Sequence, residues 1–98
     1  RLITLSPARP NPVAGSTRID YRLQRAGQVT LALYDVRGRL VARLPQGFQA
    51  VGEHALNWTP DGLPEGTYFY VCKVYESRVG GVVLRPDVLS GYIELLRG

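Results

Sequence analysis

Apolar and polar residues alternate one by one along several short stretches of this chain. In Thr17–Leu23, for example, Ile19, Tyr21 and Leu23 alternate with charged residues. Successive side chains of a β-strand face opposite sides of a sheet, so the pattern predicts strands with one face in a core and the other in solvent. No apolar stripe of helical period persists for three turns. We therefore expect an all-β fold.

Glycine and proline mark turns at short intervals between these stretches. We expect strands at 17–23, 28–34, 39–44, 52–58, 67–75 and 92–97, with 82–84 as a short strand or extended loop edge and 1–9 as a linker or first strand. Pro45–Gly47 is expected to end the strand 39–44, and Ser90-Gly91 to precede the last strand. Many short strands with regular turn signals predict a β-sandwich or barrel.

The inward-facing residues of these strands are expected to form the core. Its predicted members are Ile19, Leu23, Val29, Leu31, Leu33, Leu56, Trp58 and Val71. In the last strand, Ile93 and Leu95 should pack inward, while Glu94 and Arg97 should lie near solvent. An exposed single charge shifts stability by under roughly 0.5 kcal/mol, so Arg97→Glu is expected to leave the fold intact.

The composition favours one ordinary globular domain over residues 1–98. The net charge is +4, but the 11 arginines and Lys73 are scattered, which disfavours nucleic-acid binding. No apolar stretch approaches the roughly 20 residues of a membrane-spanning helix. The chain starts at Arg1 rather than Met, so we expect a piece of a longer protein, with this domain monomeric.

Residues that could support catalysis or metal binding are sparse. His54 is the only histidine, and Glu53 beside it should face the other side of its strand. Cys72 is the only cysteine, which excludes an intrachain disulfide and suits a small buried side chain. The carboxylates are dispersed and form no calcium-loop pattern. We therefore expect no enzyme, no cofactor and no metal site.

Two short motifs have structural explanations. Tyr68 follows Gly66 with the spacing of a tyrosine corner, in which a buried tyrosine hydroxyl bonds to the backbone a few residues upstream. Asp35 precedes Gly38 by three residues at a strand end, where its carboxylate can accept backbone N–H bonds of the turn. Trp58 is expected to be a large core side chain.

Taken in order, four motifs resemble the C-terminal sorting domain of type IX secretion cargo, type A. They are Pro10-Asn11-Pro12, Ile19-Asp20-Tyr21-x-Leu23, Ala26-Gly27-Gln28-Val29-Thr30-Leu31 and Tyr34-Asp35-Val36-x-Gly38-Arg39. The Ig-like domain of the flagellar hook-capping protein is similar over the same stretches. The end of the chain, Ser90-Gly91-Tyr92-Ile93-x-Leu95-x-Arg97, is more similar to the type B, gliding-motility-associated sorting domains.

This resemblance implies an Ig-like or fibronectin-III-like antiparallel sandwich of about seven strands. It also implies a non-catalytic module that directs a larger protein across the periplasm, through the outer-membrane secretion machinery, to the medium or the cell surface. A sortase-like protease often removes the module and links the cargo to lipopolysaccharide. The candidate recognition or structural residues are Pro10, Asn11, Pro12, Asp35, Gly38, Arg39, Gly66, Tyr68, Tyr92 and Arg97.

Two other functions are compatible with the same residues. Six tyrosines and Trp58 could give a carbohydrate-binding accessory module of a secreted hydrolase a stacking face, provided that those rings are exposed. A purely structural Ig-like spacer would keep every strand without acting in secretion.

Overall fold

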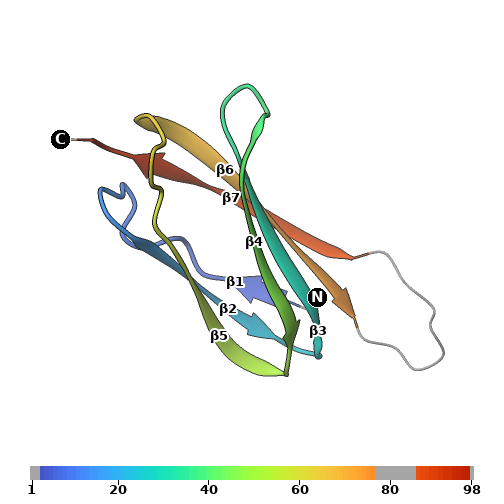
Figure 1. Ribbon diagram of the computed structural model, residues 1–98. Coiled ribbons are helices and arrows are strands. Elements are labelled where there is room, and N and C mark those ends of the chain that lie inside the picture. Colours follow the sequence, from blue (N-terminus) through green and yellow to red (C-terminus); the bar gives the residue numbers. More distant parts are fainter. Residues whose placement is uncertain (1–2, 77–85, 98) are drawn as a thin grey trace.

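The computed structural model describes residues 3–76 and 86–97 and contains seven β-strands (Figure 1). In chain order they are β1 (Ile3–Leu5), β2 (Thr17–Leu23), β3 (Gly27–Tyr34), β4 (Leu40–Gln49), β5 (Gly52–Trp58), β6 (Gly66–Glu76) and β7 (Asp87–Leu95). No helix is present in the described part of the chain. The short strand expected at 82–84 lies outside the described residues.

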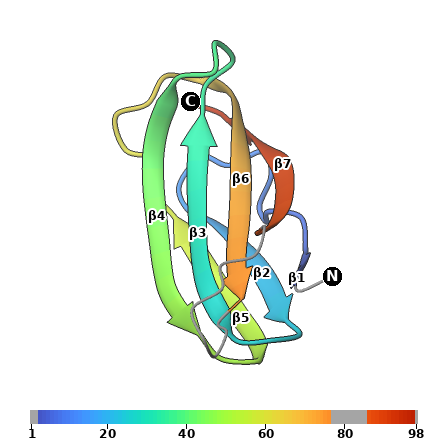
Figure 2. The same cartoon turned by 90° about the vertical axis from the view of Figure 1, so that its right-hand side faces the viewer.

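The strands form two antiparallel sheets that pack face to face (Figure 2). The smaller sheet has the order β1-β2-β5 and the larger one the order β4-β3-β6-β7. Figure 2 shows that the edge strands β1 and β7 lie on one side of the sandwich and the edge strands β4 and β5 on the other. The predicted all-β, Ig-like sandwich of about seven strands is confirmed.

The inner faces of both sheets share one apolar core. It contains seven of the eight predicted residues, together with others such as Ile3, Val13, Tyr70 and the predicted Ile93 and Leu95. The prediction that the eighth residue, Val71, lies in the core is wrong. Val71 is only half-buried, while Tyr70 and Cys72 on either side of it are buried. Because neighbours on a strand face opposite sides, Val71 lies on the outer face of the larger sheet.

β4 extends beyond its predicted end. Pro45–Gly47 was expected to break this strand, but pairing with β3 continues to Gln49. A register shift between Val29 and Thr30 accommodates the proline opposite Thr30. Since β4 is an edge strand, the N–H that proline lacks is not needed by a further neighbour.

β7 begins five residues earlier than predicted, at Asp87, and runs through Ser90-Gly91. Gly91 pairs with Tyr70, and a β-carbon at Gly91 would lie 2.2 Å from the Tyr70 hydroxyl oxygen. The glycine therefore makes room for a buried aromatic ring instead of marking a turn. At the other terminus, Ile3 in β1 is fully buried and pairs with Leu23.

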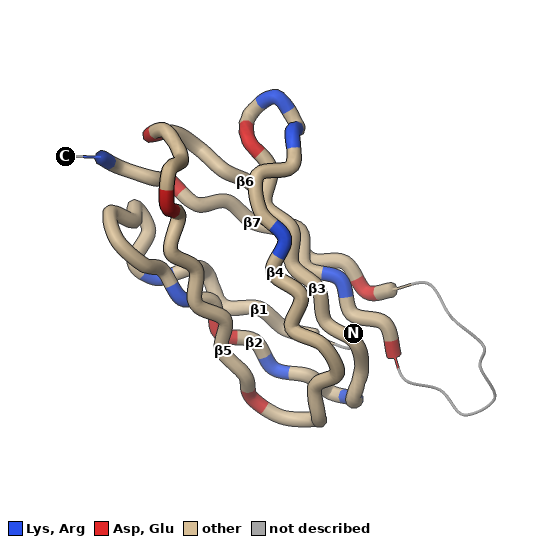
Figure 3. Tube along the Cα trace, in the orientation of Figure 1, with Lys and Arg blue, Asp and Glu red and all other residues tan. Residues whose placement is uncertain are grey.

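Charged residues are spread over strands and loops of both sheets (Figure 3). Several arginines pair with carboxylates; Arg9 and Arg18, for example, both contact Asp20 at 2.9 and 2.6 Å. The hydrogen bond from Arg18, more than that from Arg9, lowers the pKa of Asp20. The charged side chains of the described residues are therefore dispersed, and several of the arginines are paired.

Candidate functional site

The candidate residues gather toward one end of the sandwich. Thr17 at the start of β2 pairs with Trp58 at the end of β5, and Gly66 at the start of β6 pairs with Leu95 at the end of β7. The loops 9–16, 35–39 and 59–65 and residues 96–97 consequently share this end, which we call the loop end (Figures 1 and 2). The turn at Gln49–Gly52 lies at the opposite end.

The Pro10–Pro12 segment carries the chain from one sheet to the other. Just before it, Arg9 forms an isolated antiparallel bridge with Arg18 of β2, and just after it, Val13 forms a parallel bridge with Leu95 of β7. Both X–Pro peptide bonds of the segment are cis. The buried Thr17 hydroxyl donates to the Pro10 carbonyl at 2.8 Å and fixes the crossing point.

The side-chain amide of Asn11 forms hydrogen bonds with β7 that the backbone of a neighbouring strand would otherwise form. Its Nδ2 donates to the Tyr92 carbonyl at 3.1 Å, and its Oδ1 accepts the Glu94 N–H at 2.8 Å. Val13 continues this pairing with backbone bonds of 2.7 Å to the Glu94 carbonyl and 2.8 Å from the Leu96 N–H. The two ends of the sequence, each a candidate for recognition, thus form one continuous structure.

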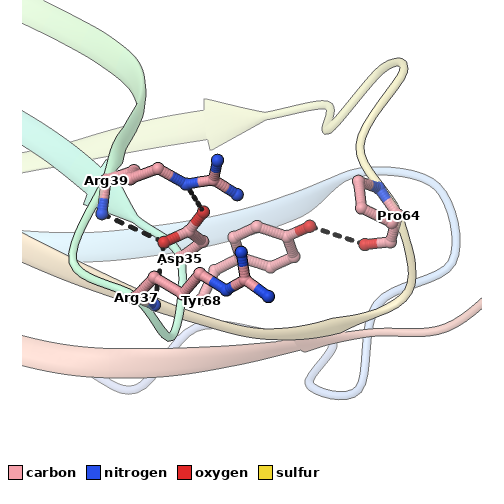
Figure 4. A network of polar contacts seen from close by, with 5 residues as sticks. All are labelled: Asp35, Arg37, Arg39, Pro64 and Tyr68. Atoms are coloured by element: carbon pink, nitrogen blue, oxygen red, sulfur yellow. Dashed lines mark hydrogen bonds and ion pairs between the residues drawn. The ribbon is translucent and has the colours of Figure 1, made fainter.

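The Asp35 carboxylate organises the turn between β3 and β4 (Figure 4). It accepts the backbone N–H groups of Arg37 at 2.9 Å and Arg39 at 3.0 Å, and the Arg39 Nε at 2.9 Å. Gly38 supplies a φ of 80°, which favours glycine. The backbone bond from Arg39, followed by its guanidinium, lowers the pKa of Asp35. The bonds expected of this aspartate are therefore present.

The expected tyrosine corner is also present. Tyr68 is 3% exposed, and its hydroxyl donates to the Pro64 carbonyl at 2.6 Å (Figure 4). Gly66 adopts a φ of 154° as the chain enters β6. The Trp58 ring meets the Tyr68 ring edge-on, with 6.2 Å between their centres. The corner thereby connects the loop 59–65 to the core.

Arg97 holds the same loop from the C-terminal side. Its backbone N–H bonds to the Glu65 carboxylate at 2.9 Å, and its guanidinium bonds to the Leu63 carbonyl at 3.0 Å and to the Pro60 carbonyl. Arg97 lies near solvent as predicted, but it is not a free charge. Arg97→Glu is therefore expected to destabilise the domain, unlike the neutral effect expected from the sequence, because a carboxylate would face the carbonyls that the guanidinium now satisfies.

The outer face of β7 contributes two different side chains to the loop end. Glu94 is half-buried and accepts the Thr67 hydroxyl at 2.7 Å, so it is less open to solvent than expected. Tyr92 is 55% exposed and pairs with Phe69, which is also exposed. Tyr92 is thus the candidate residue that offers the largest free apolar side chain.

The contacts of His54 and Cys72, the residues considered for catalysis or metal binding, are those of structural side chains. The His54 ring stacks on Tyr21 with 5.3 Å between centres, and its Nε2 lies 2.7 Å from the Ala50 carbonyl. Cys72 is buried, and burial raises the pKa of its thiol to about 11. In residues 3–76 and 86–97, no three histidine, cysteine or acidic side chains gather as a metal site would require. The same residues contain no helix long and apolar enough to span a bilayer.

Three aromatic rings that could have formed a sugar-stacking face lie in the core. Trp58, Tyr68 and Tyr70 are 6%, 3% and 5% exposed. Their burial weighs against a carbohydrate-binding face made from these rings.

Three residues that hold the loop end together were not predicted from the sequence: Val13, Thr17 and Glu65. Val13 could have been suspected as an apolar residue directly after a proline-rich segment. The partners of Thr17 and Glu65 had no local signal, because the groups they bond come from other elements.

A family model described as the secretion system C-terminal sorting domain matches residues 9–79. The chain belongs to this family of type IX secretion sorting domains. The match to the sorting domain includes the Pro10–Pro12 segment, the Asp35 turn and the tyrosine corner, whereas β7 and Arg97 lie beyond it. Membership shows a type IX sorting role and implies export to the cell surface or secretion. The family consists of sorting signals and not of catalysts.

Comparison with solved structures supports the fold of this sorting domain. CopC from Methylosinus trichosporium OB3b aligns with a TM-score of 0.53 and 23% identity over 95% of this chain and 90% of its own. Identity at this level shows a shared sandwich architecture alone. No curated protein sequence matches the chain.

Proposed function

We propose that this sorting domain directs a larger protein through the type IX machinery of the outer membrane to the cell surface, and that it does so as a folded, non-catalytic module. The observation that carries the proposal is the family match over residues 9–79, which spans the five strands from β2 to β6. The partners are the outer-membrane secretion machinery and a sortase-like protease.

The bonding at the loop end favours recognition of a folded surface. The polar groups of Asn11, Asp35, Tyr68 and Arg97 are each engaged by other residues of the domain. Side chains that are hydrogen-bonded within the domain shape its surface. They are not free to bind a receptor in the way that the side chains of an unfolded linear signal would be. The machinery would instead contact what this framework displays, including the exposed ring of Tyr92.

The position of β1 limits where a sortase-like protease could remove the module. Ile3 is fully buried and paired with Leu23, and β1 and β2 continue this pairing through Leu5. Proteases need an extended, accessible segment, which paired and buried backbone does not provide. We therefore place the cleavage point before Ile3. Mass spectrometry of the released module from exported cargo would test this, since a new N-terminus at Thr4 or later would contradict it.

A reporter fusion tests the sorting role itself. Residues 1–98 would be fused to the C-terminus of a periplasm-directed reporter and expressed in a host with a working type IX system. We expect the reporter at the cell surface or in the medium, while the reporter without the domain stays in the periplasm. A fusion that stays in the periplasm would contradict the proposal.

A further inference from the structure

The outer edge of β7 is covered along only half of its length. From Tyr92 to Leu96, the even-numbered residues direct their N–H and C=O groups away from β6, toward Asn11 and Val13. Backbone groups alternate in direction along a strand, and the register between β6 and β7 is regular from Asp87 to Leu95. Val88 and Ser90 must therefore direct their backbone groups to the same outer edge.

These groups form an open row of donors and acceptors. No backbone partner for the edge-facing groups of Val88 and Ser90 occurs among residues 3–76 and 86–97. The Tyr92 N–H points the same way, since the carbonyl of that residue faces Asn11. An unpaired strand edge of this kind is a template for another extended chain.

A groove runs beside this open edge, between the two sheets. Its volume is about 470 Å³, and its lining includes Leu5, Pro7, Ala8, Tyr70 and Leu89. Leu5 to Ala8 come from the β1 side and Leu89 from β7, the two strands that form the same side of the sandwich (Figure 2). The lining is mostly apolar, so the groove can accept apolar side chains from a strand that pairs with β7.

The Pro10–Pro12 segment explains why the edge is open. Val13 runs parallel to β7, and a chain continuing straight back from Asn11 would lie along Ser90 and Val88. Instead the chain crosses to the smaller sheet, where Arg9 bridges Arg18. This segment therefore does not cover the edge Val88–Tyr92.

We propose that the edge Val88–Tyr92 and its groove bind an extended peptide strand of a partner protein, parallel to β7. Val13 supplies the pattern: its backbone bonds to the residues flanking Leu95, and its side chain is fully buried. A guest residue opposite Gly91 would bond to Ser90 and Tyr92 in the same way. The residues of the bound peptide that pair with the edge are then also those whose side chains enter the groove. The preferred peptide therefore has small apolar residues at alternate positions.

A second copy of this domain suits the groove less well. If two β7 edges met, the inward side chains of the second β7 would already be covered within its own core, as Ile93 and Leu95 are here. Such a pair would leave the groove unfilled. The inference rests on the geometry of the edge and is independent of the sorting role.

The test uses a synthetic peptide, Glu-Val-Thr-Val-Thr-Val-Glu, whose acidic ends suit the +4 charge of the domain. Binding to the purified domain would be measured by fluorescence anisotropy and located by amide chemical shifts. We expect shifts centred on Val88–Tyr92. N-methylation of the central Val should weaken binding about tenfold or more, because it removes a bond and inserts a methyl at the edge. N-methylation of the next Thr, whose N–H faces away, should change affinity by less than about twofold.

A variant of the domain tests the same bond from the other side, with Ser90→Ala as its matched control. Ser90→Pro removes an edge-facing N–H without removing a bond to β6, as proline on an edge strand allows. It should lower affinity about tenfold, while Ser90→Ala should not. If Ser90→Pro fails to fold, the methylated peptides decide with the unaltered domain. Equal binding of both methylated peptides, no binding of the parent peptide, or a dimer in sedimentation that Ser90→Pro dissociates would each overturn the proposal.

Discussion

Replacing Asn11 by Ala tests whether this side chain substitutes for strand backbone. The change removes a donor to the Tyr92 carbonyl and an acceptor of the Glu94 N–H. A typical hydrogen bond contributes a net 0.5–1.5 kcal/mol, so the two together should contribute about 1–3 kcal/mol to the free energy of unfolding. In a domain of this size, each kcal/mol lowers the melting temperature by about 4–8 °C.

The assay is urea unfolding of the purified domain followed by Trp58 fluorescence, with thermal melting as a second probe. Asn57→Ala is the matched control, because Asn57 lies exposed on β5 and makes no side-chain hydrogen bond within the described residues. It should change the free energy of unfolding by less than about 0.5 kcal/mol. If Asn11→Ala destabilises no more than Asn57→Ala, the bridging role of Asn11 is refuted.

Three further outcomes follow from the loop end. Tyr68→Phe should lower the free energy of unfolding by about 1–3 kcal/mol in urea titrations, because it leaves the Pro64 carbonyl without its donor. Arg97→Gln should cost about 1–2 kcal/mol, measured against Arg43→Gln, whose exposed parent side chain forms no ion pair in the described part of the chain. The folded-state pKa of Asp35 is lowered, so its stabilisation is present above its ordinary value of 3.8 and is lost as the pH falls through the lower folded value. The stability difference between the native domain and Asp35→Asn should therefore shrink in melting curves taken at successively lower pH below about 4, and a constant difference would refute this assignment.

Most of the sandwich could be predicted because it depends on local patterns. The strands Thr17–Leu23 and Gly52–Trp58 were predicted with the bounds that the structure has, since alternation and flanking turn residues are read directly from sequence. The predicted strand bounds were wrong where a neighbouring strand or side chain allows a proline or glycine to remain within a strand. Pro45 remains in a strand because β4 is an edge, and Gly91 remains in one because Tyr70 needs its space.

The arrangement of the loop end could not be predicted from local patterns. Asn11 and Tyr92 are 81 positions apart, and nothing near either residue indicates the other. Likewise, Arg97 looks like an exposed terminal charge until the carbonyls of the loop 59–65 are placed beside it. The motifs identified which residues matter, and only the sheet topology shows that they hold one another in place.

The dependence of export on folding tests the central claim, that this chain sorts its cargo as a folded module, most directly. The reporter fusion carrying Tyr68→Phe would be compared with the unaltered fusion at one temperature below both melting points and at one between them, with exported reporter normalised to total reporter. We expect equal export at the lower temperature and, at the higher one, export of the unaltered fusion alone. Equal export of both fusions at both temperatures would contradict the account, because a signal read as a linear sequence does not require the fold.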